Sequence, residues 1–255
     1  MDFDFTDDQT SLRDATRKWV DKGYDFERRG SIVEAGGFSR EAYGELADLG
    51  LTGLYIAEDD GGIGMGPVEG MVVMEELGRG IVLEPFAQTL IASGVLSAHA
   101  PQAVKAASLP KIASGESLVV LAYQERAARY HFEKCEAKAA SAQDGWALTA
   151  IKNIVPAGDQ ADAFIVPAMA DGQMALFLVE RTATGVTTRG YGMQDGAHAA
   201  DLTLDNAPAT LITLEGLEAL AYAIDIGIAA TCAEAVGVMD RALAVTVEYM
   251  NTRKQ

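Results

Sequence analysis

The sequence predicts an α+β fold in which two helical regions lie on either side of a β region. Apolar residues recur at helical spacing through residues 1–117. Strand-length apolar runs and hairpin signals follow through residues 118–215, and helical spacing returns in residues 216–255. We therefore expect an N-terminal helical domain, a middle antiparallel β domain shaped as a small sandwich or an open barrel, and the first long helix of a C-terminal helical bundle.

The first helix is expected to begin at a capping box. The Thr6 hydroxyl can accept a backbone N–H, and Gln9, three residues later, can reach back to the Thr6 amide. Four apolar residues then recur at helical spacing and are predicted to face the core: Leu12, Ala15, Trp19 and Val20.

Later helices in this region are marked by residues that begin or end them. Ser39 is expected to cap a second helix that stops at Gly50, and Pro67 suits the first position of a third helix that ends at Gly78. The second helix is predicted to bury Tyr43, Leu46 and Leu49. Further helices are predicted at 89–98 and 103–113, separated by Pro101.

The middle region carries short apolar segments of strand length. They are Leu118–Ala122, Ala147–Val155, Ala163–Ala168, Met174–Val179 and Ala200–Leu204. Asp144-Gly145 and Asp171-Gly172 are strong hairpin signals, because an Asp-Gly pair suits the two positive φ angles of a tight turn. These features predict a domain of antiparallel hairpins.

The last region is predicted to be one long helix from about Leu217. Its apolar stripe is Leu220, Ile224, Ile228, Cys232, Ala235, Met239 and Ala242. The chain stops at Gln255 without a helix-ending glycine or proline. We interpret this as a helix cut in mid-course, so that the rest of the helical bundle lies beyond the sequence.

Composition and charge exclude several classes of function. The formal net charge of −17 disfavours nucleic acid and anionic membranes. No apolar run reaches the ~18 residues that span a bilayer, and the acidic start lacks the features of a signal peptide, so we expect a cytoplasmic protein with no membrane insertion. Cys135, Cys232 and three scattered histidines have no metal-ligand spacing, so no metal site is expected.

Two polar or glycine-rich features have plain structural interpretations. The segment Gly61–Gly66 does not fit a dinucleotide-binding loop, because its third glycine would fall at Pro67 and Glu58–Asp60 would lie beside the pyrophosphate. A flexible connection between helices is the better interpretation. Lys152, in a strand-like stretch, is interpreted as a solvated side chain beside a turn. The residues themselves leave Arg253 open as either a solubilising charge or an anion contact.

Four segments, in order, resemble the acyl-CoA dehydrogenase superfamily. They are Phe5–Asp14, the stretch Leu46–Leu51 followed by Glu58 and Gly61–Gly64, then Glu75–Arg79, and finally Glu248–Gln255. The resemblance covers the whole chain. It implies a flavoprotein that holds FAD and removes two hydrogens from an acyl-CoA thioester to give a trans-2-enoyl-CoA. It also implies an electron-transfer flavoprotein as the electron acceptor and a place in fatty acid metabolism.

The resemblance also implies site residues. Tyr123, Gln124 and Glu125 occupy the first flavin-contacting segment of the family, with Gln124 in the place of a threonine. Pro156 stands in the second segment, where the family has another threonine, and Ile154 replaces its tryptophan. Arg253, with Gln255, matches residues that reach the FAD pyrophosphate across a dimer interface. The catalytic residue of this chain is unknown, since the general-base glutamate is expected beyond residue 255.

The middle domain is similar to that of a divergent branch of the superfamily, the small subunits of pimeloyl-CoA-type and steroid side-chain dehydrogenases. The segments Tyr191–Gly196 and Ala199–Leu202 carry this likeness. One hypothesis is therefore a dehydrogenase subunit acting on a medium, dicarboxylic or bulky acyl-CoA, within a homo- or hetero-oligomer that contains a related subunit. A second is a non-catalytic or flavin-poor partner subunit. A third is another enzyme on the same fold, such as an acyl-CoA oxidase.

Overall fold

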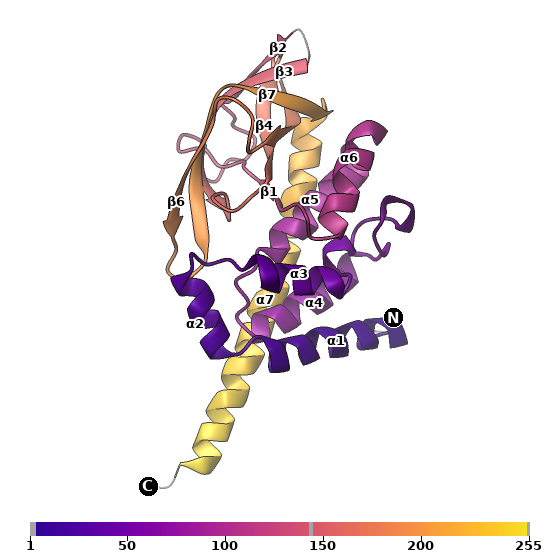
Figure 1. Cartoon of the computed structure of the whole chain (residues 1–255), viewed down its shortest axis with the longest axis vertical. Coiled ribbons are helices and arrows are strands. Elements are labelled where there is room, and N and C mark those ends of the chain that lie inside the picture. The colour runs from indigo at the N-terminus through magenta and orange to yellow at the C-terminus, as the bar shows by residue number, and fades with distance from the viewer. Residues whose placement is uncertain (1–3, 143–144, 254–255) are drawn as a thin grey trace.

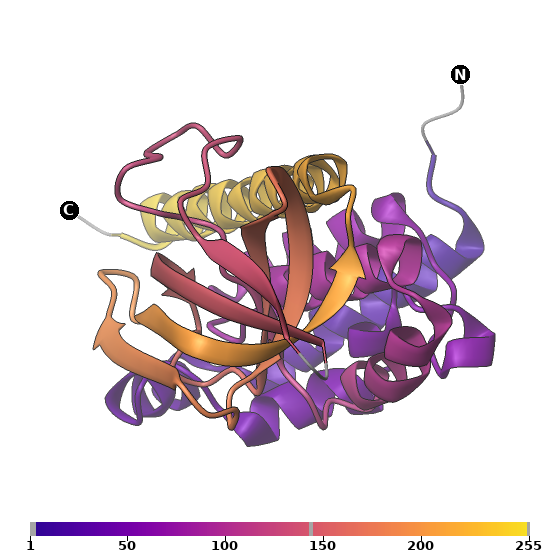
Figure 2. The same cartoon turned by 90° about the horizontal axis from the view of Figure 1, so that it is seen from above.

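The computed structural model describes residues 4–142 and 145–253 and confirms the predicted fold class. The N-terminal helices form one lobe, the strands form a second lobe, and the long helix α7 (Gly216–Thr252) runs between the two (Figures 1 and 2). The second half of α7 extends away from both lobes, toward the C-terminus (Figure 1).

The N-terminal lobe contains six α-helices within the described residues. They are α1 (Asp7–Gly23), α2 (Phe26–Glu34), α3 (Arg40–Asp48), α4 (Pro67–Arg79), α5 (Phe86–His99) and α6 (Gln102–Ala113), with two short 3₁₀ turns at Leu51–Gly53 and Glu58–Asp60. The capping box of α1 is confirmed: the Gln9 amide donates to Thr6 Oγ1 over 3.2 Å, and the Thr6 amide donates to Gln9 Oε1 over 3.0 Å. Ala15 was wrongly placed on the core face of α1, because Thr16 is buried there and its hydroxyl donates to the Leu12 carbonyl.

Helix α2 was absent from the prediction, so Ser39 caps the third helix of the chain and not the second. The Ser39 hydroxyl accepts the Ala42 amide over 3.2 Å. The structure buries Tyr43 and Leu46 as predicted, but Leu49 is 40% exposed. Leu49 follows the end of α3 and precedes Gly50, whose φ of 77° turns the chain away from the helix axis.

The Gly61–Gly66 connection joins two helical segments, as predicted, but it is closely packed and not open. A Cβ atom on Gly62 would lie 2.1 Å from the Ile56 carbonyl oxygen. The amide of Gly64 donates to the same carbonyl over 2.7 Å. The glycines therefore permit one stretch of backbone to lie directly on another.

A buried carboxylate links two helices of the N-terminal lobe. Glu76 on α4 has no exposed surface, and its oxygens accept from Arg17 Nη2 over 2.5 Å and Arg17 Nε over 3.0 Å. Arg79 Nε lies 3.2 Å from the same carboxylate. Because the guanidinium groups come from both α1 and α4, the carboxylate joins the two helices.

The β lobe is a seven-stranded sheet that closes on itself. Its strands are β1 (Val119–Leu121), β2 (Lys138–Ala142), β3 (Gly145–Pro156), β4 (Ala163–Ala170), β5 (Gln173–Glu180), β6 (Val186–Gly192) and β7 (His198–Thr213). Neighbouring strands follow the circuit β4-β2-β3-β7-β5 and return to β4. Most pairings are antiparallel, as predicted, but β1 and β2 each pair with β4 in parallel. The barrel is therefore closed and not open, although β2 meets β4 only at Lys138 and Met169.

The hairpin between β4 and β5 confirms one of the two predicted turns. Asp171 and Gly172 have φ angles of 48° and 88°, as a tight turn with two positive φ angles requires. At the other turn, Asp144 lies outside the described residues and Gly145 begins β3. Strands β2 and β6, which were not predicted, expose most of their side chains.

Helix α7 extends beyond both ends of the predicted apolar stripe, and the face that it buries is not the face of that stripe. Its buried residues are Gly216, Ala219, Leu220, Ala223, Ile226, Ala230, Ala233 and Gly237. Of the predicted stripe only Leu220 is fully buried, while Ile228 and Met239 are 56% and 62% exposed. A Cβ on Gly237 would lie 1.9 Å from the Glu75 carbonyl oxygen, and one on Gly78 would lie 2.3 Å from the Glu234 carbonyl oxygen. The small residues thus let α4 and α7 cross with their backbones in contact.

Among the described helices, α7 alone has the length and apolar character that crossing a membrane requires. Its most apolar window has a mean hydropathy of 1.5, and 28% of that window is buried. One such helix is weak evidence for membrane insertion, because a helix packed on two lobes has the same composition. The expectation of no membrane insertion stays a prediction.

Candidate functional site

Three of the predicted cofactor residues lie together at one cleft. Tyr123, Gln124 and Pro156 line a cavity of about 440 Å³, which we call the near cleft. The rest of its wall comes from β1, β3, α5 and α7: Leu121, Ile154, Gln88, Ile91, Ala223, Ile224, Gly227, Ile228, Thr231 and Cys232. The near cleft therefore lies where the barrel, the N-terminal lobe and α7 meet.

Hydrogen bonds from two backbone amides fix the barrel side of the near cleft. The Leu121 amide donates to Gln88 Oε1 over 3.0 Å, which ties β1 to α5. The Asn153 amide donates to the Gln124 carbonyl over 2.9 Å, which ties the segment after β1 to β3. Ile154 and Ala157, with φ angles of 52° and 51°, bend the end of β3 on either side of Pro156. Ile154 is 52% exposed at the cleft.

Lys152 was wrongly interpreted as solvated. Its side chain has no exposed surface, and Nζ donates to Glu125 Oε1 over 2.6 Å and to the Pro167 carbonyl over 2.8 Å. The amides of Glu136 and Ala137 also donate to the Glu125 carboxylate. Burial acts to raise the pKa of Glu125, but Lys152 and the two amides outweigh it and hold that pKa below its usual value.

Glu125 therefore has a structural role inside the barrel that the sequence did not reveal. It is absent from the near cleft, although it directly follows Gln124. Its carboxylate bonds to the interior lysine and to the segment before β2, so it joins three parts of the barrel. A direct contact of Glu125 with a cofactor stays a prediction.

Arg253 lies far from the near cleft. It ends α7, 21 residues beyond Cys232, and at 1.5 Å per residue this places the two about 32 Å apart. Its guanidinium carbon lies 5.6 Å from the centre of the Tyr249 ring. Arg253 of this chain cannot reach a ligand in its own near cleft, so the predicted pyrophosphate contact requires a second subunit. Gln255 lies outside the described residues.

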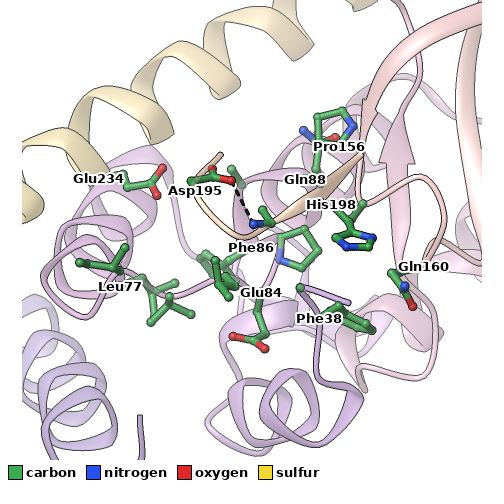
Figure 3. Close-up of a pocket in the computed structure, with 18 of the residues that line it drawn as sticks. Phe38, Leu77, Glu84, Phe86, Gln88, Pro156, Gln160, Asp195, His198 and Glu234 are labelled. Atoms are coloured by element: carbon green, nitrogen blue, oxygen red, sulfur yellow. Dashed lines mark hydrogen bonds between the residues drawn. The ribbon is translucent and has the colours of Figure 1, made fainter. Parts of the chain in front are cut away.

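A second cavity, of about 360 Å³, adjoins the near cleft and was not predicted from the sequence (Figure 3). Gln88 and Pro156 line both cavities and form their common wall. We call this second space the far cavity. Its apolar walls include Phe38, Met74, Leu77, Val82 and Phe86, and its polar lining includes Arg29, Glu84, Gln160, Asp195, His198 and Glu234.

Several carboxylates line the far cavity, and burial raises the pKa of two of them. Burial raises the pKa of Glu84, which is 4% exposed, although the Tyr24 hydroxyl and the Ser39 amide oppose this. Burial also raises the pKa of Glu234, and the negative charge of Asp195 adds to the effect. His198 Nδ1 lies 2.8 Å from Asp159 Oδ2. Glu84, an acidic residue within an apolar stretch, is a sequence signal that could have pointed to this site.

No group of three or more potential ligands that could hold a metal ion occurs within residues 4–142 and 145–253. In the same part of the chain, neither Cys135 nor Cys232 is in a disulfide.

The comparison with known proteins decides the family. Residues 6–116 match the family model for the N-terminal domain of acyl-CoA dehydrogenases. Over this part the chain matches the acyl-CoA dehydrogenase family, and beyond it the chain is similar to acyl-CoA dehydrogenases. It is 26% identical over 220 residues to the acyl-CoA dehydrogenase FadE27 of Mycobacterium tuberculosis, and 26% identical over 234 residues to the mitochondrial isovaleryl-CoA dehydrogenase of Pongo abelii.

Solved acyl-CoA dehydrogenase structures have the same fold. The ChsE4–ChsE5 complex of Mycobacterium tuberculosis contains a chain with 25% identity and a TM-score of 0.90, and the match covers 100% of this chain and 70% of that one. The G363A variant of the steroid acyl-CoA dehydrogenase Tcur3481–Tcur3483 has 27% identity and a TM-score of 0.87, and the match covers 97% of this chain and 68% of that one. A glutaryl-CoA dehydrogenase in complex with glutaryl-CoA has a TM-score of 0.93 at 23% identity, over 100% and 69%.

The chain spans only part of these acyl-CoA dehydrogenases. The FadE27 match covers 86% of this chain and 58% of that protein, and the isovaleryl-CoA dehydrogenase match covers 84% and 55%. The part of the relatives that has no counterpart here is therefore large.

The near cleft fits one part of FAD and not another. FAD is the cofactor to which the superfamily points, and a neighbour in the fold was solved with FADH2. Apolar side chains and the polar groups of Tyr123, Gln124 and Thr231 suit a flat ring system with hydrogen-bonding edges. No lysine or arginine lines the near cleft among the described residues, and Pro156 has no N–H to donate. The pyrophosphate of FAD therefore requires donors from outside this cleft.

We expect the two cysteines to report on occupancy of the near cleft. Cys232 is exposed and lines the cleft, whereas Cys135 is half-buried and its burial raises the pKa of its thiol. A maleimide should therefore alkylate Cys232 several-fold faster than Cys135. Saturating FAD should slow the reaction of Cys232 and leave Cys135, the internal control, unchanged. Peptide mass spectrometry over time measures both rates, and an unaltered rate at Cys232 would place FAD elsewhere.

Proposed function

We propose that this protein takes part in the flavin-dependent α,β-dehydrogenation of an acyl-CoA thioester, as one subunit of a larger assembly. The observation that carries the proposal is the near cleft, which brings Tyr123, Gln124 and Pro156 together against α5 and α7 in a chain of this superfamily. Bound FAD would supply the redox chemistry by accepting a hydride. Gln124 and Tyr123 would hold its ring through hydrogen bonds.

A base for removing the substrate α-proton has no candidate at the near cleft. Among the described residues, no aspartate, glutamate or histidine lines it. We propose that the base lies outside the near cleft, as the resemblance to the family implies.

A non-catalytic or flavin-poor partner subunit is the second candidate. Two observations favour it: the near cleft lacks a cationic group for phosphate, and Arg253 lies about 32 Å from Cys232 along α7. A ChsE4–ChsE5 complex among the structural neighbours supports a heteromeric assembly, since the chain matched there belongs to such a complex. In either role we propose a cytoplasmic protein whose assembly transfers electrons to an electron-transfer flavoprotein.

The visible absorption spectrum separates these two roles. If the chain has its own flavin site, the purified protein should show flavin bands that bleach when an acyl-CoA is added. If the site is shared, the protein should be colourless alone and yellow after co-expression with a related subunit. Protein that stays colourless in both preparations would reject the flavin-dependent function for this chain and leave the assembly role.

A further inference from the structure

We propose that the far cavity receives the distal end of the acyl chain and selects a chain that ends in a hydroxyl over one that ends in a carboxylate. This inference rests on the proposed function, because it requires the thioester end of the substrate to occupy the near cleft. It narrows the range of medium, dicarboxylic or bulky acyl groups that the sequence left open.

The far cavity lies directly beside the near cleft. Gln88, on α5, and Pro156, at the end of β3, line both spaces. Gln88 is held there by the bond between its Oε1 and the Leu121 amide. A chain that passes this common wall enters a space lined by Leu77, Phe86 and other apolar side chains (Figure 3). Both volumes lie within the ~300–1,000 Å³ typical of small-molecule sites.

The charges in the far cavity disfavour a carboxylate. Glu84, Asp195 and Glu234 line it, and Figure 3 shows Asp195 and Glu234 near one another on the α7 side. Arg29 is the single lysine or arginine in the lining among the described residues. Its guanidinium already donates to the carbonyls of Ile81 and Asp195, over 2.9 and 2.6 Å. Where Glu84 and Glu234 are ionised, a second carboxylate would therefore meet like charges in a partly desolvated space.

One of the same groups supplies a hydrogen-bond acceptor that has no donor. Glu84 Oε2 is buried and has no hydrogen-bond partner within the described residues. A hydroxyl can donate to such an oxygen, whereas an ionised carboxylate can only accept.

Three acyl-CoAs of equal chain length test the inference by isothermal titration calorimetry on the purified protein. They are dodecanoyl-CoA, its ω-hydroxy derivative and its ω-carboxy derivative. We expect the ω-hydroxy compound to bind most tightly, and at least about tenfold more tightly than the ω-carboxy compound, which corresponds to about 1.4 kcal/mol. Equal affinity for the hydroxy and carboxy compounds would overturn the inference. If none of the three binds, the proposed function fails as well.

Glu234→Gln tests the source of the selectivity, since it removes the charge and keeps the shape. The variant should bind the ω-carboxy compound more tightly, so that the ratio of its affinities for the ω-hydroxy and ω-carboxy compounds falls close to one. Asp195→Asn should lower this ratio as well. Asp225→Asn is the matched control, because Asp225 is exposed on the same helix and lines neither cavity. If both cavity variants keep the selectivity, or if the control loses it to the same extent, then the far cavity does not recognise the distal group.

Discussion

Replacing Glu125 with glutamine is expected to lower the free energy of unfolding by about 3–5 kcal/mol. Lys152 has no exposed surface, and its ammonium donates to Glu125 Oε1 over 2.6 Å and to the Pro167 carbonyl over 2.8 Å. Without the carboxylate, a buried cation would remain with only neutral partners inside the barrel. Urea denaturation followed by circular dichroism measures the loss.

Two further variants make this first result interpretable. Glu136→Gln removes an exposed carboxylate near the same strand and should change stability by less than about 0.5 kcal/mol. The double variant Glu125→Leu with Lys152→Met removes both charges, so it should be more stable than Glu125→Gln alone. A Glu125→Gln protein as stable as the wild type would mean that Lys152 finds water or loses its proton at little cost.

The same pair predicts the direction of an acid effect. The folded pKa of Glu125 is lowered, so its carboxylate contributes stability above the unfolded pKa of about 4.3, and this stability is lost as the pH falls through the folded value. The wild type should therefore lose stability on acidification more steeply than Glu125→Gln, which lacks this titrating group. Parallel denaturation curves from neutral to acid pH would show the difference.

Gly237→Ala is expected to have the second largest effect, a loss of about 3 kcal/mol or more. The new Cβ would lie 1.9 Å from the Glu75 carbonyl oxygen and 3.0 Å from the Arg79 amide nitrogen, so α4 and α7 must move apart. Both neighbours are backbone atoms and cannot turn aside as a flexible side chain can. Thermal or urea denaturation measures the effect.

Gly30→Ala is the matched control for this substitution. Gly30 lies inside α2, and a Cβ there would meet no atom within 4 Å. Alanine favours the helix by up to about 1 kcal/mol, so this variant should be neutral or more stable. If Gly237→Ala were equally harmless, the crossing of α4 and α7 would have to be far more compliant than their backbone contact indicates.

The sequence predicted elements whose signals are local. Thr6 and Gln9 mark the start of α1, and Asp171-Gly172 marks the β4–β5 turn, because each depends on residues within one turn of the chain. Helix α2 was missed since Ile32 is its one buried residue and Phe26 is 79% exposed, so it has little apolar periodicity. Strands β2 and β6 were missed for the same reason.

The features that the sequence did not predict depend on distant contacts. Lys152 is buried because it forms an ion pair inside the barrel with Glu125, which lies 27 residues away in the sequence. No local sequence pattern predicts such a pair. Helix α7 is apolar on more than one face, so its periodicity could not identify the face that meets α4 and α5. The near cleft was partly found, since resemblance identified Tyr123, Gln124 and Pro156. The far cavity required the fold, because its lining comes from five separate segments.

The outer face of α7 also governs how copies of the chain behave in solution. Leu243, Tyr249 and Met250 are each more than half exposed on its second half, and contiguous apolar surface of this kind promotes association. The net charge of −17 opposes this by mutual repulsion. Salt weakens that repulsion, since the Debye length falls from about 30 Å at 0.01 M to about 3 Å at 1 M, but leaves the apolar attraction in place. Colloidal stability of the isolated chain should therefore be greatest at low ionic strength.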